Sequence, residues 1–299
     1  MIVYIYSIFF FIIPPKITIP CISISSGDNK PVPYVTVKRK NKAEGLFADE
    51  NGRFCYENLS LGDTLQFSAV GFQTIEKSYQ DLLISEKVVL AEYIMNLEEV
   101  EVKKQRPKTT IIGNYRKGKL SYNSYAPNSL LALASFIENS EGISGILKNI
   151  KVGVFHDDFA FRLRLRFFRN TTDNLPDKRD LVLENIIVDT KVKSQFVEID
   201  LEKYAIPFEK DGIWLSIESI GKFDENNILI PNKMGKFGKA NYNKNAKIKF
   251  IDSLSPYVKY VKTKSLIPPY MKTWENRWTR IFKNEKSNYA MMLDLNILY

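Results

Sequence analysis

The segment Ala160–Phe168 (AFRLRLRFF) constrains the fold more than any other part of this 299-residue chain. Its apolar side chains alternate with arginines along most of its length. Since successive side chains of a strand point to opposite faces, this alternation predicts a β-strand with one apolar face and one charged face. The apolar face comprises Phe161, Leu163, Leu165 and Phe167, and the charged face comprises Arg162, Arg164 and Arg166.

Short strand-like segments recur about every ten residues in two regions of the chain, and turn-forming residues separate them. The turn Asp49–Gly52 (DENG) is typical of a β-hairpin, because asparagine and aspartate satisfy local backbone groups and glycine accepts a positive φ. A chain of this length holds about two domains. We therefore predict a mainly β protein with two sandwiches. The other strand-like segments are Pro33–Lys38, Thr64–Val70, Gln73–Lys77, Lys87–Leu90, Asp180–Asp189, Gln195–Leu201 and Gly212–Ser219.

The first region resembles the carboxypeptidase-like regulatory domain, a transthyretin-like fold common in exported Bacteroidetes proteins. The resemblance rests on Pro31–Val37, on Asp49–Gly52 followed by Phe54, and on Gly62–Phe72. It implies a seven-stranded sandwich. It implies no carboxypeptidase activity, because this domain is the noncatalytic appendage of such enzymes.

The second region resembles an uncharacterised jelly-roll domain of the same exported proteins. The matching segments are Phe161–Arg164, Leu175–Pro176, Asp180–Val182, Phe196–Leu201 and Ile213–Glu218. This resemblance implies a jelly-roll sandwich and no reaction.

The predicted organisation has four parts, with boundaries at composition changes. Residues 1–20 form a leader, residues 21–95 the regulatory-like domain, and residues 96–127 a basic linker with one short strand over Leu97–Val102. Residues 128–299 begin with a short helix over Asn128–Glu138, continue as the jelly roll and end in an aromatic arm.

The amino-terminal segment Met1–Ile13 is apolar but shorter than the roughly 20 residues that span a bilayer. It is typical of a secretory signal, although no basic residue precedes it and no A-x-A pattern follows. We expect export to the periplasm or the outer-membrane surface. Cys21 and Cys55 either form a disulfide or remain thiols, and acylation of Cys21 is a further alternative.

Few residues suited to metal or acid–base chemistry are present. A single histidine, His156, and two cysteines cannot supply a zinc hydrolase site, so we predict no metal and no cofactor. Near matches to a phosphate-binding loop (Gly113–Lys119) and a nucleophile elbow (Gly142–Gly145) each lack a required residue or context. The net charge of +9 is spread along the chain. We therefore expect no nucleic-acid partner, while attraction to an anionic membrane surface stays an alternative.

Three groups of side chains are candidates for ligand binding. Trp214, Ser216 and Glu218 alternate onto one face of a predicted strand, and the arginines of Arg162–Arg166 face phosphates, acidic glycans or cross-strand acids such as Glu198 and Asp200. Exposed aromatic rings beside a carboxylate suit sugar stacking, whereas the alternative for all of them is core packing. The third group lies at four-residue spacing in Tyr270–Phe282, on a helix or a packing arm, and comprises Tyr270, Trp274 and Trp278.

We therefore predict a noncatalytic accessory or binding protein of the cell envelope. Its partner would be a glycan, a surface polymer or an envelope protein, bound on a sandwich face. The alternative is a hydrolase of polysaccharide or peptide that uses two carboxylates brought together by the fold.

Overall fold

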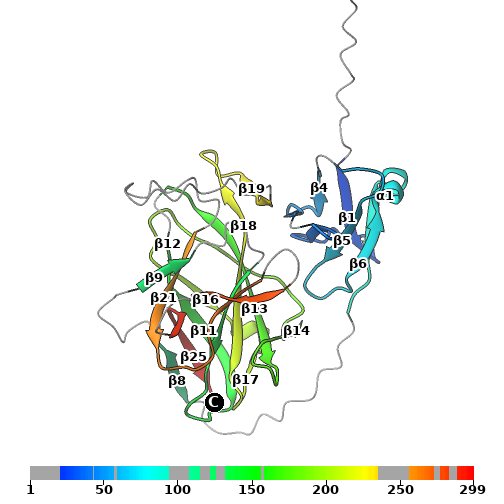
Figure 1. The fold of residues 1–299 in the computed structure, drawn as a ribbon. Helices are drawn as coiled ribbons and strands as arrows, with labels where there is room; N and C mark the ends of the chain where they lie inside the picture. The colour runs from blue at the N-terminus through cyan, green and yellow to red at the C-terminus, as the bar shows by residue number, and fades with distance from the viewer. Residues whose placement is uncertain are drawn as a thin grey trace, which may run out of the picture.

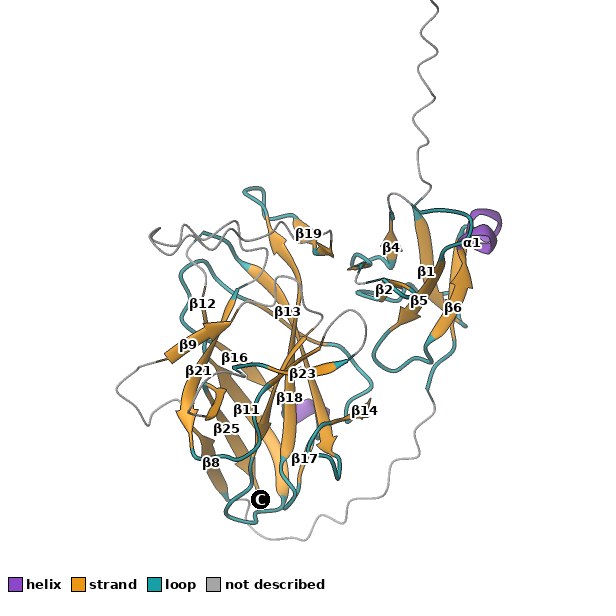
Figure 2. Ribbon diagram, viewed as in Figure 1, coloured by secondary structure: helices purple, strands orange, loops and turns teal. Residues whose placement is uncertain are grey.

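The computed structural model describes residues 21–42, 44–56, 59–93, 108–114, 122–125, 132–155, 158–234, 256–272, 277–282 and 288–299. Its described residues form a small β domain, blue to cyan in Figure 1, and a larger sandwich, green to red. Strands and loops account for nearly all of both domains (Figure 2). The predicted mainly β fold with two sandwiches is confirmed.

The small domain contains seven consecutive strands and one helix, arranged in two sheets. One sheet has the order β4-β1-β7, and the other has the order β20-β3-β2-β5-β6, in which β20 comes from the larger domain. The elements are β1 (Ile22–Ser26), β2 (Thr36–Arg39), β3 (Gly45–Phe47), β4 (Arg53–Phe54), β5 (Thr64–Ser68), β6 (Ile75–Ser78), α1 (Tyr79–Ser85) and β7 (Lys87–Leu90).

Apolar residues from both sheets form the core of the small domain, including Ile24 of β1 and Leu65 and Phe67 of β5. A disulfide joins Cys21 to Cys55 beside the paired residues Ile22 and Phe54 of β1 and β4. It closes a loop across 34 positions of sequence. The two cysteines are therefore paired, which excludes a thioether-linked lipid on Cys21 in this form of the chain.

The predicted turn at Asp49–Gly52 is confirmed. The Asp49 carboxylate accepts hydrogen bonds from the backbone N–H groups of Asn51 and Arg53, at 2.9 and 2.8 Å. Gly52 has a φ of +69°, and a Cβ there would lie 2.5 Å from the carbonyl oxygen of Ile24. Only glycine fits this position without displacing the backbone.

The large domain is built from three sheets that enclose one core. An eight-stranded sheet has the path β14-β13-β18-β10-β22-β23, a five-stranded sheet has the path β16-β11-β25-β8, and a four-stranded sheet contains β12-β21-β24. The strands of the first sheet are β10 (Ala132–Ile137), β13 (Phe161–Asn170), β14 (Pro176–Asp180), β15 (Ile186–Asp189), β18 (Ile213–Phe223), β19 (Leu229–Pro231), β22 (Tyr270–Lys272) and β23 (Trp278–Arg280).

The remaining elements complete the sandwich and its link to the small domain. They are β8 (Thr109–Gly113), β9 (Tyr122–Tyr125), β11 (Gly145–Val152), β12 (Val154–Phe155), β16 (Val197–Asp200), η1 (Glu202–Tyr204), β17 (Pro207–Phe208), β20 (Lys233–Met234), β21 (Tyr257–Thr263), β24 (Asn288–Met291) and β25 (Leu293–Leu298). The predicted apolar face of β13 packs into the core of this domain.

The predicted helix over Asn128–Glu138 is wrong where the structure describes it, since Ala132–Ile137 forms strand β10. This strand lies between β18 and β22, and all six of its residues are buried. A strand covered on both faces shows no alternation, so its short apolar run is easily taken for a helix. The one α-helix described, α1, lies inside the small domain, where Ser78 caps it by accepting the N–H of Asp81.

Two further expectations also differ from the structure. The arm Tyr270–Phe282 forms strands β22 and β23 instead of a helix, and Thr109–Gly113 of the predicted linker forms strand β8 of the sandwich. The predicted strand Leu97–Val102 lies outside the described residues. No helix among the described residues has the length and apolar character needed to span a membrane.

Candidate functional site

Most of the predicted binding residues converge on one surface, which we call the outer face. It is the side of β13, β18, β10 and β22 that points away from the core of the large sandwich. In the antiparallel register of β13 and β18, Arg164 lies opposite Glu218 and Phe168 lies opposite Trp214. The face therefore runs from charged residues at one end to aromatic residues at the other.

A buried ion-pair network occupies the centre of the outer face. Arg164 Nε donates to Glu218 Oε2 at 2.6 Å, and Arg166 donates to Glu218 Oε1 at 3.0 Å. Arg166 also makes two parallel bonds to Asp180, at 2.7 and 2.6 Å. The side chains of Arg164 and Glu218 are each only 1% exposed.

The cross-strand partners of the arginines differ from those predicted. Glu198 and Asp200 lie on β16, which pairs with β11 in the five-stranded sheet. Glu218 and Asp180 of the neighbouring strands take their place. The sequence candidates were wrong because strand order, which the sequence does not state, selects the neighbours of β13.

The small domain covers this network. Arg164 donates to the carbonyl oxygen of Tyr34 at 2.9 Å and to the hydroxyl of Thr36 at 3.3 Å. Tyr34 and Phe47 form a buried apolar cluster with Ile220 of β18. Strand β20 of the large domain adds to the edge of β3 in the small one. The centre of the outer face is thus an interface between the two domains.

Burial and charge shift the pKa values of Glu218 and Lys272 in this region. Burial alone would raise the pKa of Glu218, but Arg164 and Arg166 outweigh it and hold that pKa below the ordinary value. Burial, with the nearby positive charge of Arg166, lowers the pKa of Lys272 to about 8. The ammonium nitrogen of Lys272 also lies 5.4 Å from the centre of the Trp278 ring.

The aromatic end of the outer face is closed. Trp214 is 0% exposed, packs against Phe136 and Tyr270 at ring distances of 5.4 and 5.7 Å, and donates its indole N–H to Asn170 at 2.8 Å. Tyr270 and Trp278 are partly buried against the same cluster. The expectation that Trp214 and Glu218 present an open face is therefore corrected, because packing covers both. Trp274 lies outside the described residues.

The other end of the outer face opens into a cleft between the domains. Arg162 makes two bonds to Asp189, both 2.7 Å, and a third to the Tyr34 hydroxyl at 2.7 Å. A carboxylate oxygen of Glu50, in the small domain, lies 3.6 Å from a guanidinium nitrogen of Arg162. The centre of the Phe223 ring lies 5.3 Å from the Cζ atom of Arg162.

The cleft has a volume of about 530 Å³, within the range of roughly 300–1,000 Å³ that ligand pockets occupy. Asp49, Asn51, Thr190 and Asn227 add polar groups to its lining, and Phe223 adds an aromatic surface. We call this space the interdomain cleft. The antiparallel register of β13 and β15 places Asp189 opposite Arg162, and the packing of the two domains brings Glu50 to the same guanidinium. Neither pairing could be predicted from the sequence, because each depends on which segments lie side by side in the fold.

Metal ligation has no support in the part of the chain that the structure describes. No group of three or more histidine, cysteine, aspartate or glutamate side chains is arranged to hold an ion there. The acidic turn at Asp224 is structural, because its carboxylate accepts the N–H groups of Asn226 and Ile228. His156 lies outside the described residues.

The small domain matches a known domain family. Residues 23–102 match the family model of the CarboxypepD_reg-like domain, which confirms the resemblance read from the sequence. No curated protein matches the chain in sequence. The protein is thus a two-sandwich protein with a CarboxypepD_reg-like domain at its amino-terminal end.

Two solved structures show low similarity. The cysteine protease and lectin-like domains of Cwp84, a surface layer associated protein of Clostridium difficile, are 12% identical, with a TM-score of 0.38 over 85% of this chain and 45% of that one. A structure of infectious bursal disease virus Gx strain is 10% identical, with a TM-score of 0.16 over 88% of this chain and 64% of that one. This chain therefore spans less than half of the first structure. At these scores neither similarity bears on the fold or the function.

Proposed function

We propose that this protein is a noncatalytic binding protein of the cell envelope, which recognises a glycan in the interdomain cleft. The observation that carries the proposal is the composition of the cleft. It combines the ring of Phe223 with the carboxylates of Asp189 and Glu50 and the amides of Asn51 and Asn227. Sugars offer apolar ring faces and many hydroxyl groups, so an aromatic surface surrounded by hydrogen-bonding groups suits them.

The geometry of Arg162 favours a preformed site. Its guanidinium is held by two bonds to Asp189 and one to the Tyr34 hydroxyl. This fixes the Asp189 carboxylate while leaving acceptor capacity on both of its oxygens. A site whose groups are already ordered loses less entropy when a ligand binds.

The Cys21–Cys55 disulfide supports an extracytoplasmic location. Structural disulfides form and persist in oxidising compartments and are rare in the cytosol. We place the protein in the periplasm or at the outer-membrane surface, consistent with the apolar segment Met1–Ile13.

The test is a glycan array, followed by calorimetry on the glycans retained by the full chain. Asp189→Asn and Phe223→Ala should each weaken binding at least about tenfold, because each removes a group that contacts the ligand. Phe196→Ala is the matched control, since Phe196 is exposed and lies on another part of the large domain. Retention of no glycan by the unaltered protein, or equal binding by all three variants, would refute the proposal.

A carboxylate-dependent hydrolase is the second candidate, because Glu50 and Asp189 both line the cleft. Both carboxylates contact the guanidinium of Arg162, which occupies the space between them. In a glycosidase the scissile bond lies between the two carboxylates, so this arrangement favours binding over hydrolysis. Release of new reducing ends from a bound glycan, abolished by Asp189→Asn, would instead establish the hydrolase.

A further inference from the structure

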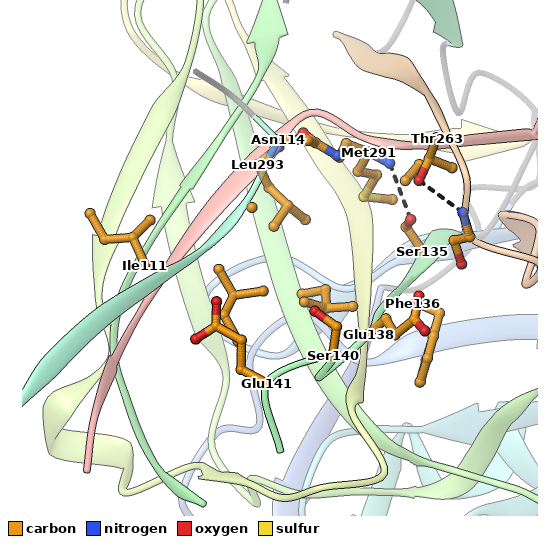
Figure 3. Close-up of a pocket in the computed structure, with 15 residues that line it drawn as sticks. Ile111, Asn114, Ser135, Phe136, Glu138, Ser140, Glu141, Thr263, Met291 and Leu293 are labelled. Atoms are coloured by element: carbon orange, nitrogen blue, oxygen red, sulfur yellow. Dashed lines mark hydrogen bonds between the residues drawn. The ribbon is translucent and has the colours of Figure 1, made fainter. Parts of the chain in front are cut away.

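A second pocket lies at the edge of the large sandwich. It shares no lining residue with the interdomain cleft. It has a volume of about 230 Å³ and lies between β8, the end of β10 and the segment that joins β24 to β25. Figure 3 shows Glu138, Ser140 and Glu141 along one wall and Asn114, Met291 and Leu293 along the opposite one. We call it the edge pocket.

Strand β8 is the last strand of its sheet, and among the described residues no strand pairs with its outer edge. Lys108 and Tyr299 exchange both backbone hydrogen bonds, at 2.8 and 2.9 Å. In an antiparallel pair such exchanges alternate along the strand, so Thr110 and Ile112 face β25 in the same way. The N–H and C=O groups of the alternate residues Thr109, Ile111 and Gly113 therefore point to the open edge.

The edge pocket follows this open edge. Neighbouring residues of a strand point to opposite faces, yet both Ile111 and Ile112 line the pocket. Gly113 lines the pocket as well and has no side chain, so the backbone of β8 is itself part of the pocket wall. Two of its lining residues, Ile111 and Gly113, carry the outward backbone groups described above.

The charge of the pocket is opposite to that of the protein. The chain has a net charge of +9, whereas the described residues that line the pocket include two carboxylates, Glu138 and Glu141, and no basic side chain. Both glutamates are exposed, and neither forms an ion pair within the described part of the chain. Asn139 between them is buried and bonds to Ile143 and to the carbonyl oxygen of Glu209, which holds their loop in place.

We propose that an extended, basic peptide segment of another protein adds as a strand to the outer edge of β8. Its backbone would pair with Ile111 and Gly113, and a lysine or arginine side chain would enter the edge pocket beside Glu138 and Glu141. Pairing at an open edge supplies affinity through main-chain hydrogen bonds, and the pocket supplies specificity through a side chain. The charge complementarity selects this occupant over a neutral or acidic segment.

The probe is a short blocked peptide that alternates valine and lysine, compared with its valine–glutamate counterpart by fluorescence anisotropy on the full chain. The lysine peptide should bind at least about tenfold more tightly. A version methylated on alternate backbone nitrogens cannot pair and should lose binding.

Two sets of variants test separately the contribution of the two carboxylates and that of the open edge of β8. The double variant Glu138→Gln/Glu141→Gln should weaken the lysine peptide about tenfold, whereas the exposed control Glu184→Gln should not. Ile111→Pro should also weaken it, because proline removes an outward N–H that β25 does not use. Ile111→Val keeps that N–H and should bind as the unaltered protein does.

Several results would overturn the proposal. They are absence of binding by the lysine peptide, equal binding of both peptides, and binding unchanged in the double glutamine variant. The glutamine variant decides the matter even if Ile111→Pro fails to fold, since it alters only exposed side chains. Self-association that Ile111→Pro abolishes, without peptide binding, would assign the edge to a second copy of the chain and would also overturn it.

Discussion

Arg162 and Arg164 are two residues apart on the same face of β13, yet they belong to different environments. Arg164 is 1% exposed and bonds to Glu218 and to the backbone of Tyr34 in the other domain. Arg162 is 18% exposed, and its partner Asp189 is 42% exposed in the interdomain cleft. Two similar ion pairs on one strand thus differ in burial, because the small domain covers Arg164 and Glu218 completely but contacts Arg162 only through Tyr34 and Glu50, which leaves Asp189 open to the cleft.

The two ion pairs also differ in what they contribute to the free energy of unfolding. A buried ion pair costs much desolvation, and removal of one partner leaves a charge that nothing nearby compensates. An exposed pair gains little, because water and salt screen it. Substitutions at the covered centre should therefore change stability, and substitutions at the open end should change binding.

The largest effect is expected for Glu218→Gln. It removes the anion shared by Arg164 and Arg166 and should lower the free energy of unfolding by about 3–5 kcal/mol. Asp189→Asn at the open end should cost less than about 1 kcal/mol. Urea unfolding of both variants measures the contrast, and equal losses would show that the two pairs do not differ as described.

Removal of the disulfide should have the next largest effect and should sharpen the contrast between the two domains. Cys21→Ser/Cys55→Ser should destabilise the small domain by about 2–4 kcal/mol, because the unfolded chain gains the entropy of the opened loop. Calorimetry should show its unfolding at a lower temperature, ahead of the sandwich. Non-reducing mass spectrometry of the purified chain provides the control. A lipid-modified Cys21 would contradict the pairing on which this prediction rests.

A smaller effect concerns pH and Lys272, which faces Arg166, Glu218, Asp180 and Lys38 at the border of the covered region. Its pKa is about 8 in the folded protein, against an ordinary value of 10.5. Between these values the unfolded chain binds more protons, so the free energy of unfolding should rise with pH through that window.

Lys272→Met should remove most of this rise. It should also stabilise the protein at neutral pH by about 1 kcal/mol, because the folded state no longer holds a poorly solvated ammonium group. Unfolding titrations from neutral to alkaline pH measure the slope. Lys262→Met, at an exposed position of β21, is the control and should leave the slope unchanged. An unaltered slope in Lys272→Met would show that other groups cause it.

Local patterns were sufficient for much of the fold. Alternation in Phe161–Phe168 and the turn at Asp49–Gly52 identified a strand and a hairpin, because each depends on residues adjacent in sequence. No such alternation is present in Ala132–Ile137, because both faces of this strand are buried. The candidate site was found only in part. The sequence pointed to Arg162, Arg164 and Glu218, but not to Glu50 or Phe223.

The amino-acid order alone dictates that this chain forms β-sandwiches, that few residues suited to metal or acid–base chemistry are available, and that charged and aromatic residues share one side of β13 and β18. These properties follow from side-chain spacing and chemistry over a few residues. Whether that side is open or covered depends on the packing of a separate domain more than 100 positions away, through contacts such as Arg164 with Tyr34. Short-range spacing does not determine such contacts, so only the assembled fold shows that the centre of this side is covered and that its Arg162 end opens into a cleft.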